Sequence, residues 1–208
     1  IMGLNINLID QLTFYGSYHS NKWNQLIHFF FVPLIFWTTL VWLAYTPEAF
    51  QYDVAGHLPS GTPECIVNAA QYARYNGAYF MVLGYSLYYI LLEWFAGLTW
   101  ALFMGVPLWV SSVAFQQLVP HAWAWAVGLH IFAWFMQVFP GHAWIEGRKP
   151  ALLDSLFQSL MLAPLFVWFE LLFHLGYRPQ LFQQITSRIR EIQAARQSQQ
   201  EPLLRSTK

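Results

Sequence analysis

The sequence is poor in charge, because only 10% of its 208 residues are Asp, Glu, Lys or Arg. Soluble domains carry about 25% charged residues, so this chain has too few to cover a water-facing surface. Instead it is 57% hydrophobic and 19% aromatic. The composition excludes an ordinary soluble domain and favours one membrane-embedded unit, since the length suits a single domain.

Cysteine and several metal motifs are also scarce. Cys65 is the only cysteine, so neither an intramolecular disulfide nor a thiolate metal cluster is possible. The chain lacks His-Glu-x-x-His and the His-x-x-His-His clusters of membrane di-iron desaturases, which argues against a standard desaturase. Basic residues are few and sit in a Gln-rich tail without aromatics, which argues against nucleic acid as a partner.

The net charge of zero conceals a basic C-terminus. From residue 178 onward there are six basic and two acidic side chains. By the positive-inside rule, segment 178–208 is predicted to be a basic, polar cytosolic tail. Within it, residues 183–208 are predicted to start as an amphipathic helix and to fade into disorder. Lys22, Arg148 and Lys149 favour the same side, which predicts an even number of crossings.

Long apolar runs supply those crossings, since a bilayer needs about twenty apolar residues per helix. The runs predict an all-α, polytopic membrane helical bundle with four to five transmembrane or re-entrant helices. We favour four crossings plus one interfacial or re-entrant segment. The apolar runs are 26–45, 79–94, 95–115, 122–139 and 155–175. Runs 79–94 and 95–115 are predicted to form a tight helical hairpin. A short interfacial helix is predicted within 3–25, and a Pro/Gly-rich loop at 46–75.

Four histidines stand out in this apolar chain: His19, His28, His130 and His142. Imidazole is the commonest protein metal ligand, and a polar group in hydrocarbon is costly unless it has a partner. The two pairs therefore predict a buried metal centre. The remaining histidines, His57, His121 and His174, are predicted to be interfacial.

Helix geometry restricts how the histidines can converge. His19 and His28 are nine residues apart, which is about 900° of rotation and puts them on opposite faces of one helix. His19 must therefore precede the helix start, with Asn21 or Asn24 near the cap, while Asn24 and His28 share a face at i,i+4.

The downstream pair is predicted to need a helix break. Pro140 and Gly141 lie between His130 and His142, and are expected to interrupt the helix so that His142 turns inward. His142 and Glu146 are again four residues apart. A ligating imidazole usually donates its second N–H to a carboxylate or carbonyl, so Glu146 is a candidate for that supporting role.

The same residues carry a family resemblance. The patterns are Tyr15-x3-His19-x4-Asn24-x3-His28 and Gln137-x2-Pro-Gly-His142-x3-Glu146-Gly-Arg148, followed by Ala163-Pro164 and Glu170. With these motifs the chain resembles the Mpo1-like (DUF962) family of endoplasmic-reticulum 2-hydroxy fatty acid dioxygenases. The resemblance covers most of residues 10–175.

The resemblance implies an Fe(II)-dependent dioxygenase that shortens long-chain 2-hydroxy fatty acids by one carbon during phytosphingosine breakdown. Fe(2+) would be the cofactor, and the 2-hydroxy acid, O2 and membrane lipids the partners. Residues 1–177 would form the catalytic domain, in the endoplasmic reticulum membrane. The implied site comprises His19, His28, His130 and His142 as iron ligands, Asn24 and Gln137 to position substrate or O2, Glu146 as their support or an alternative ligand, and Tyr15 and Arg148 for substrate.

Other readings stay open on the residues alone. Arg148 and Lys149 suit a carboxylate substrate and phospholipid headgroups equally. A different metal-dependent membrane lipid hydroxylase would retain the carbon number of its substrate. A non-enzymatic lipid-binding membrane protein would hold no transition metal.

Overall fold

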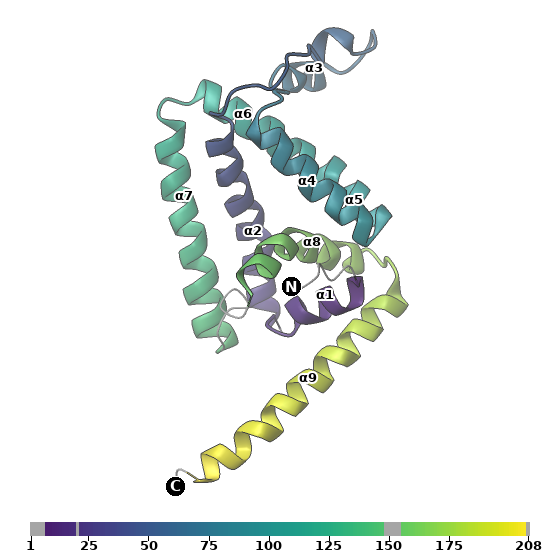
Figure 1. Ribbon diagram of the computed structural model, residues 1–208, viewed down its shortest axis with the longest axis vertical. Helices are drawn as coiled ribbons and strands as arrows, with labels where there is room; N and C mark the ends of the chain where they lie inside the picture. Colours follow the sequence, from purple (N-terminus) through teal and green to yellow (C-terminus); the bar gives the residue numbers. More distant parts are fainter. Residues whose placement is uncertain (1–6, 20, 148–154, 207–208) are drawn as a thin grey trace.

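The computed structural model describes residues 7–19, 21–147 and 155–206. These residues form helices and no strand, so the predicted all-α class is confirmed. Figure 1 shows long helices running side by side, with α1 (Leu8–Gly16) and α8 (Leu156–His174) lying across one end of them. A loop that carries the short η1 (Ala55–His57) and α3 (Glu64–Ala70) covers the opposite end.

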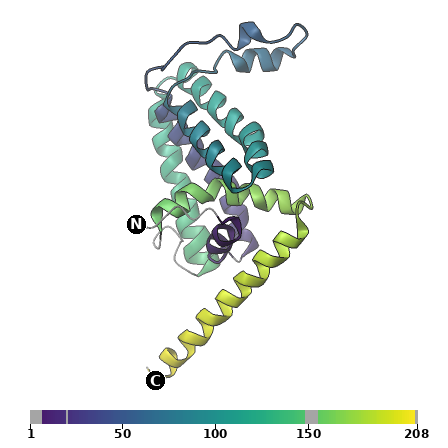
Figure 2. The same ribbon diagram turned by 45° about the vertical axis from the view of Figure 1, so that its right-hand side comes forward.

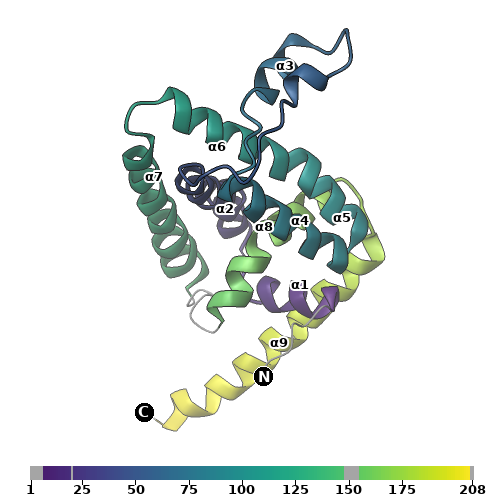
Figure 3. The ribbon, with the colours of Figure 1, turned by 45° about the horizontal axis from the view of Figure 1, so that its top comes forward.

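The central helix is α2 (Lys22–Leu43), which is apolar enough to cross a membrane. Its first turn is capped by Asn21, whose side chain accepts a hydrogen bond from the backbone N–H of Trp23. Pro33 lies inside it and removes one backbone hydrogen bond without ending the helix. Figure 3 shows α2 between α7 on one side and α4 and α8 on the other.

The predicted tight hairpin is confirmed. It consists of α4 (Gly77–Leu92) and a return arm of α5 (Trp94–Trp100), the π-helix η2 (Ala101–Gly105) and α6 (Val106–Leu118). The Glu93 carboxylate at the turn accepts a 2.7 Å hydrogen bond from the N–H of Ala96. The two arms approach closely at Gly97, where a Cβ would lie 2.3 Å from the backbone nitrogen of Ile90.

The predicted helix break at Pro140 and Gly141 is wrong. Helix α7 (Ala122–Met136) continues directly into the π-helix η3 (Gln137–Glu146). The π-helix bonds each residue to the fifth one along, and this wider turn accommodates a residue that lacks an N–H. The change of winding, instead of a break, sets the direction of His142.

Three helices within the described residues are long and apolar enough to span a membrane: Lys22–Leu43, Trp94–Leu118 and Ala122–Glu146. Helix α4 and the apolar part of α8 are shorter. Large aromatic side chains on α7 face outward, as expected where lipid covers the surface, with Trp125 62% exposed. The predicted membrane bundle of four to five helices therefore matches these three spans together with the two shorter apolar helices.

The C-terminal segment is more ordered than predicted. Helix α9 (Pro179–Ser206) runs through most of the Gln-rich tail, so the predicted disorder there is wrong. Gln, Arg and Ala are good helix formers, which the polarity of the segment hides. Its first turns pack on the bundle through buried Leu181 and Ile185, and Arg188 pairs with Asp10 of α1 at 3.0 Å. Beyond these turns the helix runs away from the bundle (Figure 2).

Replacing Gly97 tests the hairpin. In a Gly97→Ala variant the new methyl group meets backbone atoms that cannot rotate away, and overpacking of this kind costs about 1–3 kcal/mol. We expect a lower midpoint of thermal unfolding in detergent. Gly84→Ala is the matched control on the facing helix, because a Cβ there meets nothing within 4 Å. Equal midpoints for the two variants would contradict the close contact.

Candidate metal centre

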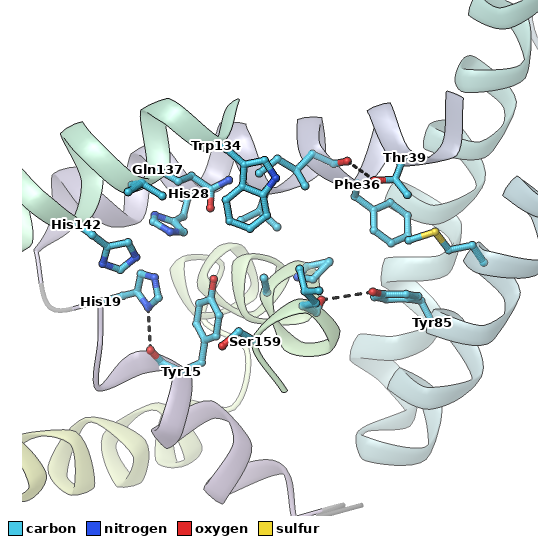
Figure 4. A pocket seen from close by; sticks show the side chains of 17 residues that line it. Tyr15, His19, His28, Phe36, Thr39, Tyr85, Trp134, Gln137, His142 and Ser159 are labelled. Carbon is cyan, nitrogen blue, oxygen red and sulfur yellow. Dashed lines mark hydrogen bonds between the residues drawn. The ribbon is translucent and has the colours of Figure 1, made fainter. Parts of the chain in front are cut away.

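Three of the four predicted histidines meet in the structure: His19, His28 and His142. One potential ligand atom from each lies within 4.8 Å of the others. The ring centroids are 4.4 Å apart for His19 and His28, and 5.0 Å from each of these to His142. Figure 4 shows the three imidazoles pointing toward one another at one end of a pocket. Such a group suits a metal ion that accepts nitrogen ligands.

His19 lies between α1 and α2, as helix geometry predicted, and its backbone and ring are both held. Its N–H donates to the carbonyl of Gly16 at 3.1 Å, and its own carbonyl accepts from the Gln25 side chain at 3.0 Å. The ring stacks on Tyr15 with 4.3 Å between centroids. The loop position is therefore as fixed as a helical one.

The tautomer of His19 follows from its partner. Its Nδ1 is 2.8 Å from the carbonyl oxygen of Tyr15, which only accepts, so Nδ1 carries the proton. The lone pair on Nε2 is buried and has no hydrogen-bond partner among the described residues. Burial lowers the pKa of His19 to about 3. The hydrogen bond to Tyr15 raises this pKa by less than burial lowers it, and His142 lowers it further. The ring is neutral at physiological pH and can bind a metal without losing a proton.

The other two rings complete the group. His28 donates from Nδ1 to the carbonyl of Asn24 at 3.0 Å, which leaves its Nε2 lone pair available. His142 is 3% exposed, and its Nδ1 has no partner within the described part of the chain. Buried polar atoms without partners cost about 1–3 kcal/mol each. A bound cation would satisfy such nitrogens, so the residues present fit a metal ion.

Glu146 joins the two ends of the site. One carboxylate oxygen accepts hydrogen bonds from the backbone N–H of Asn21 and from the side-chain amide of Asn24, both at 3.1 Å. These contacts tie the end of η3 to the start of α2. Glu146 is not a member of the three-histidine group, and its carboxylate contacts favour the predicted supporting role.

Gly141 makes room for this arrangement. A Cβ at residue 141 would lie 2.7 Å from Oδ1 of Asn24 and 3.5 Å from Cε1 of His28. Asn24 is fully buried, and its Oδ1 has no hydrogen-bond partner among the described residues. Only glycine lets η3 approach α2 this closely.

His130 does not join the other three, so the histidine group among the described residues has three members and not the predicted four. Its Nε2 accepts a 2.9 Å hydrogen bond from the indole N–H of Trp134. Its Nδ1 lies 2.8 Å from the hydroxyl of Thr38, which itself donates to the carbonyl of Ile35 at 2.9 Å. Both ring nitrogens of His130 are therefore used, Nε2 within α7 and Nδ1 in joining α7 to α2, which satisfies this polar group without a metal.

A cavity of about 190 Å³ begins at the three histidines. Its polar end also holds Gln137, Ser159 and the hydroxyl end of Tyr15, and its walls continue in apolar side chains (Figure 4). Nε2 of Gln137 and Oγ of Ser159 are buried without partners in the described structure. Burial raises the pKa of Tyr15, helped by Glu170, so its hydroxyl keeps its proton. The cavity fits a molecule with one polar end and a long apolar part.

Of the residues that the sequence predicted for the site, Tyr15 and Gln137 line the cavity, while Asn24 and Glu146 lie beside the histidines. Ser159 was missed, although a serine inside an apolar run was a usable signal. Trp134 was missed because aromatic residues are too common in this chain to single one out. Arg148, predicted to bind substrate, lies outside the described residues.

Comparison with known proteins agrees with this site. A family model described as "2-hydroxy-palmitic acid dioxygenase Mpo1-like" matches residues 6–175. The chain belongs to the Mpo1-like family. It is 34% identical, over 178 residues, to the 2-hydroxy-palmitic acid dioxygenase MPO1 of Saccharomyces cerevisiae, covering 85% of this chain and 86% of the yeast protein. No solved structure matches this Mpo1-like chain.

Alanine substitutions separate a three-histidine from a four-histidine centre. In this Mpo1-like protein, His28→Ala removes a candidate ligand, and we expect metal affinity to fall by more than about 100-fold, above the range for supporting residues. His130→Ala should change metal affinity less than about tenfold. Metal bound per folded protein, measured by elemental analysis after size-exclusion chromatography, checks both. Loss of metal in the His130→Ala variant would contradict a three-histidine centre and support four histidine ligands.

A pair of variants tests the role of Glu146. A glutamine at 146 still offers an oxygen to Asn21 and Asn24, so Glu146→Gln should keep metal affinity within about tenfold of wild type. Glu146→Ala loses the connection, and we expect a loss of about 10–100-fold. Metal titration of both proteins provides the measurement. Equal, large losses of metal affinity in the two variants would indicate that the Glu146 carboxylate itself binds the metal.

Proposed function

We propose that this protein is an Fe(II)-dependent dioxygenase that converts long-chain 2-hydroxy fatty acids to the acid one carbon shorter. The observation that carries the proposal is the three-histidine group at the polar end of an apolar cavity. Membership of a family named for 2-hydroxy-palmitic acid dioxygenase supports it. Both features suit a substrate with a metal-binding head and an acyl tail.

Iron is the proposed metal, held by His19, His28 and His142. Imidazole ligands suit Fe(II) and, when only three are present, positions stay open for substrate and O2. When bound, the iron would supply the redox chemistry that O2 needs to react with the substrate. The protein contributes three neutral rings, two of which have their proton positions fixed by the carbonyls of Tyr15 and Asn24.

The overall reaction balances without an external reductant. The 2-hydroxy acid and O2 give the shortened fatty acid, CO2 and water. The bond between C1 and C2 breaks, the two carbons are oxidised, and O2 receives the four electrons. No second cofactor or reductase is therefore required, which agrees with a site built from one chain.

Side chains at the polar end are placed to hold the substrate head. The Gln137 amide and the protonated Tyr15 hydroxyl are hydrogen-bond donors for a carboxylate or hydroxyl group. Asn24 and Glu146 act indirectly, because they keep His28 and His142 in place. Arg148 remains the predicted cationic partner of the carboxylate, on sequence grounds. The apolar walls exclude water from the reacting carbons.

The membrane supplies the substrate in this proposal. The acyl chain would reach the cavity laterally from the bilayer, within a catalytic domain of residues 1–177. The basic segment 178–208 and Lys22 would face the cytosol of a cell whose endoplasmic reticulum membrane holds the protein. The acid would arise from breakdown of the sphingoid base phytosphingosine.

A labelled substrate tests the proposed reaction. Purified, Fe(II)-loaded protein is given 2-hydroxypalmitic acid carrying carbon-13 at the carboxyl carbon. We expect pentadecanoic acid and labelled CO2 in equal amounts, with loss of both after chelation and recovery on adding Fe(II). His142→Ala should abolish turnover, while His57→Ala, an exposed histidine in the loop, serves as the matched control.

The alternatives give different results in the same assay. A lipid hydroxylase would leave the label in a product of unchanged carbon number. A lipid-binding protein would bind the acid and retain no transition metal after anaerobic purification without chelator. Recovery with Zn(II) but not Fe(II) would contradict the choice of iron.

A further inference from the structure

The cavity follows one face of α2 away from the histidines. Successive lining residues on this helix are His28, Val32, Ile35, Phe36 and Thr39. This spacing keeps them on one side of the helix. At 1.5 Å per residue, Phe36 lies about 12 Å along the helix from His28. The cavity is thus elongated in the direction in which an acyl chain would leave a head held at the histidines.

An aromatic cluster closes the far end. Phe36 is 5% exposed and meets Tyr85 of α4 edge-on, with 4.9 Å between centroids. Behind it lies Trp100 of α5, at 5.7 Å from Phe36 and 1% exposed. Figure 4 places Phe36 and Tyr85 together at the end opposite the histidines. The rings come from three helices, so the end of the cavity is also a junction of the bundle.

Hydrogen bonds hold this cluster in place. Tyr89 packs against Trp100 at 4.8 Å and donates its hydroxyl to the carbonyl of Met161 in α8 at 2.8 Å. Because its side chains come from four helices and contact one another, this wall moves less for a longer ligand than a single flexible side chain would. Met81, which also lines this end, is the adaptable type of residue, so the rigid element is Phe36 with its support.

We propose that Phe36, supported by Tyr85 and Trp100, is the residue that sets the longest acyl chain this site accepts. The inference rests on the proposed function, because it assumes that the head of the substrate is held at the histidines. A chain of the right length reaches the face of Phe36. A longer chain has to displace a buried ring or pull its head away from the metal centre.

Substitution of Phe36 by Ala, Leu and Trp tests the proposal. The probes are the 2-hydroxy derivatives of capric, lauric, palmitic and arachidic acid, bound anaerobically to Fe(II)-loaded protein and followed by thermal shift. Turnover to the shortened acid is measured separately in air. Metal content and unfolding midpoint are recorded for each variant, and Phe36→Leu covers the case in which Phe36→Ala does not fold.

We expect the preferred length to increase in Phe36→Leu and Phe36→Ala and to decrease in Phe36→Trp. Relative binding of a longer over a shorter acid should change by about tenfold, since a methylene in an apolar pocket is worth 10–200-fold. Phe30→Ala is the matched control, as Phe30 is on the same helix, 62% exposed and outside the cavity. Its length profile should equal that of wild type.

Two readouts separate failure of the inference from failure of the proposed function. A binding profile that is flat in wild type, or equally scaled for all lengths in the Phe36 variants, overturns the role of Phe36. A length preference that shifts as expected without any shortened acid supports the role of Phe36 and refutes the dioxygenase proposal. Shortened products whose length profile ignores Phe36 support the enzyme and refute the inference.

Discussion

The contact between Glu146 and the start of α2 is the constraint on which the site depends. It joins a carboxylate at the end of one membrane-spanning helix to the backbone and side-chain N–H groups of Asn21 and Asn24 in the first turn of another. Negative charge is stabilised at a helix N-terminus, so the helix dipole adds to the hydrogen bonds. With these two ends held, His28 and His142 face each other and His19, in the adjoining loop, completes the group.

Much of this was accessible from sequence, because it depends on local periodicity. Apolar runs predicted the bundle, the hairpin and a short first helix. The rotation between His19 and His28 required one of them to precede the helix, and the structure has His19 before Asn21, the cap of α2. The i,i+4 relation of Asn24 with His28 holds for the same reason. His142 and Glu146 lie in the π-helix instead, and the Glu146 carboxylate bonds to Asn21 and Asn24.

The remainder depended on neighbours that are distant in sequence. His130 was predicted as a ligand because an imidazole without a partner is costly in apolar surroundings. In the structure Thr38 and Trp134 are its hydrogen-bond partners. Thr38 is distant in sequence, so the periodicity around His130 could not indicate it. Most of the cavity walls were missed on the same grounds, since their residues come from six helical elements. The tail was misjudged because polarity predicts disorder, whereas its glutamines and arginines also favour helix.

The π-helix at residues 137–146 has a consequence for how this protein tolerates insertions and deletions. A π-turn accommodates one residue more than an α-turn, and such turns often occur at functional sites. Insertion of one more residue before His142, which no further wide turn would absorb, would rotate everything beyond it by about 100°. His142 would then leave the cluster with its chemistry intact. Chain length in this segment is therefore as specific to the site as the identity of the ligands.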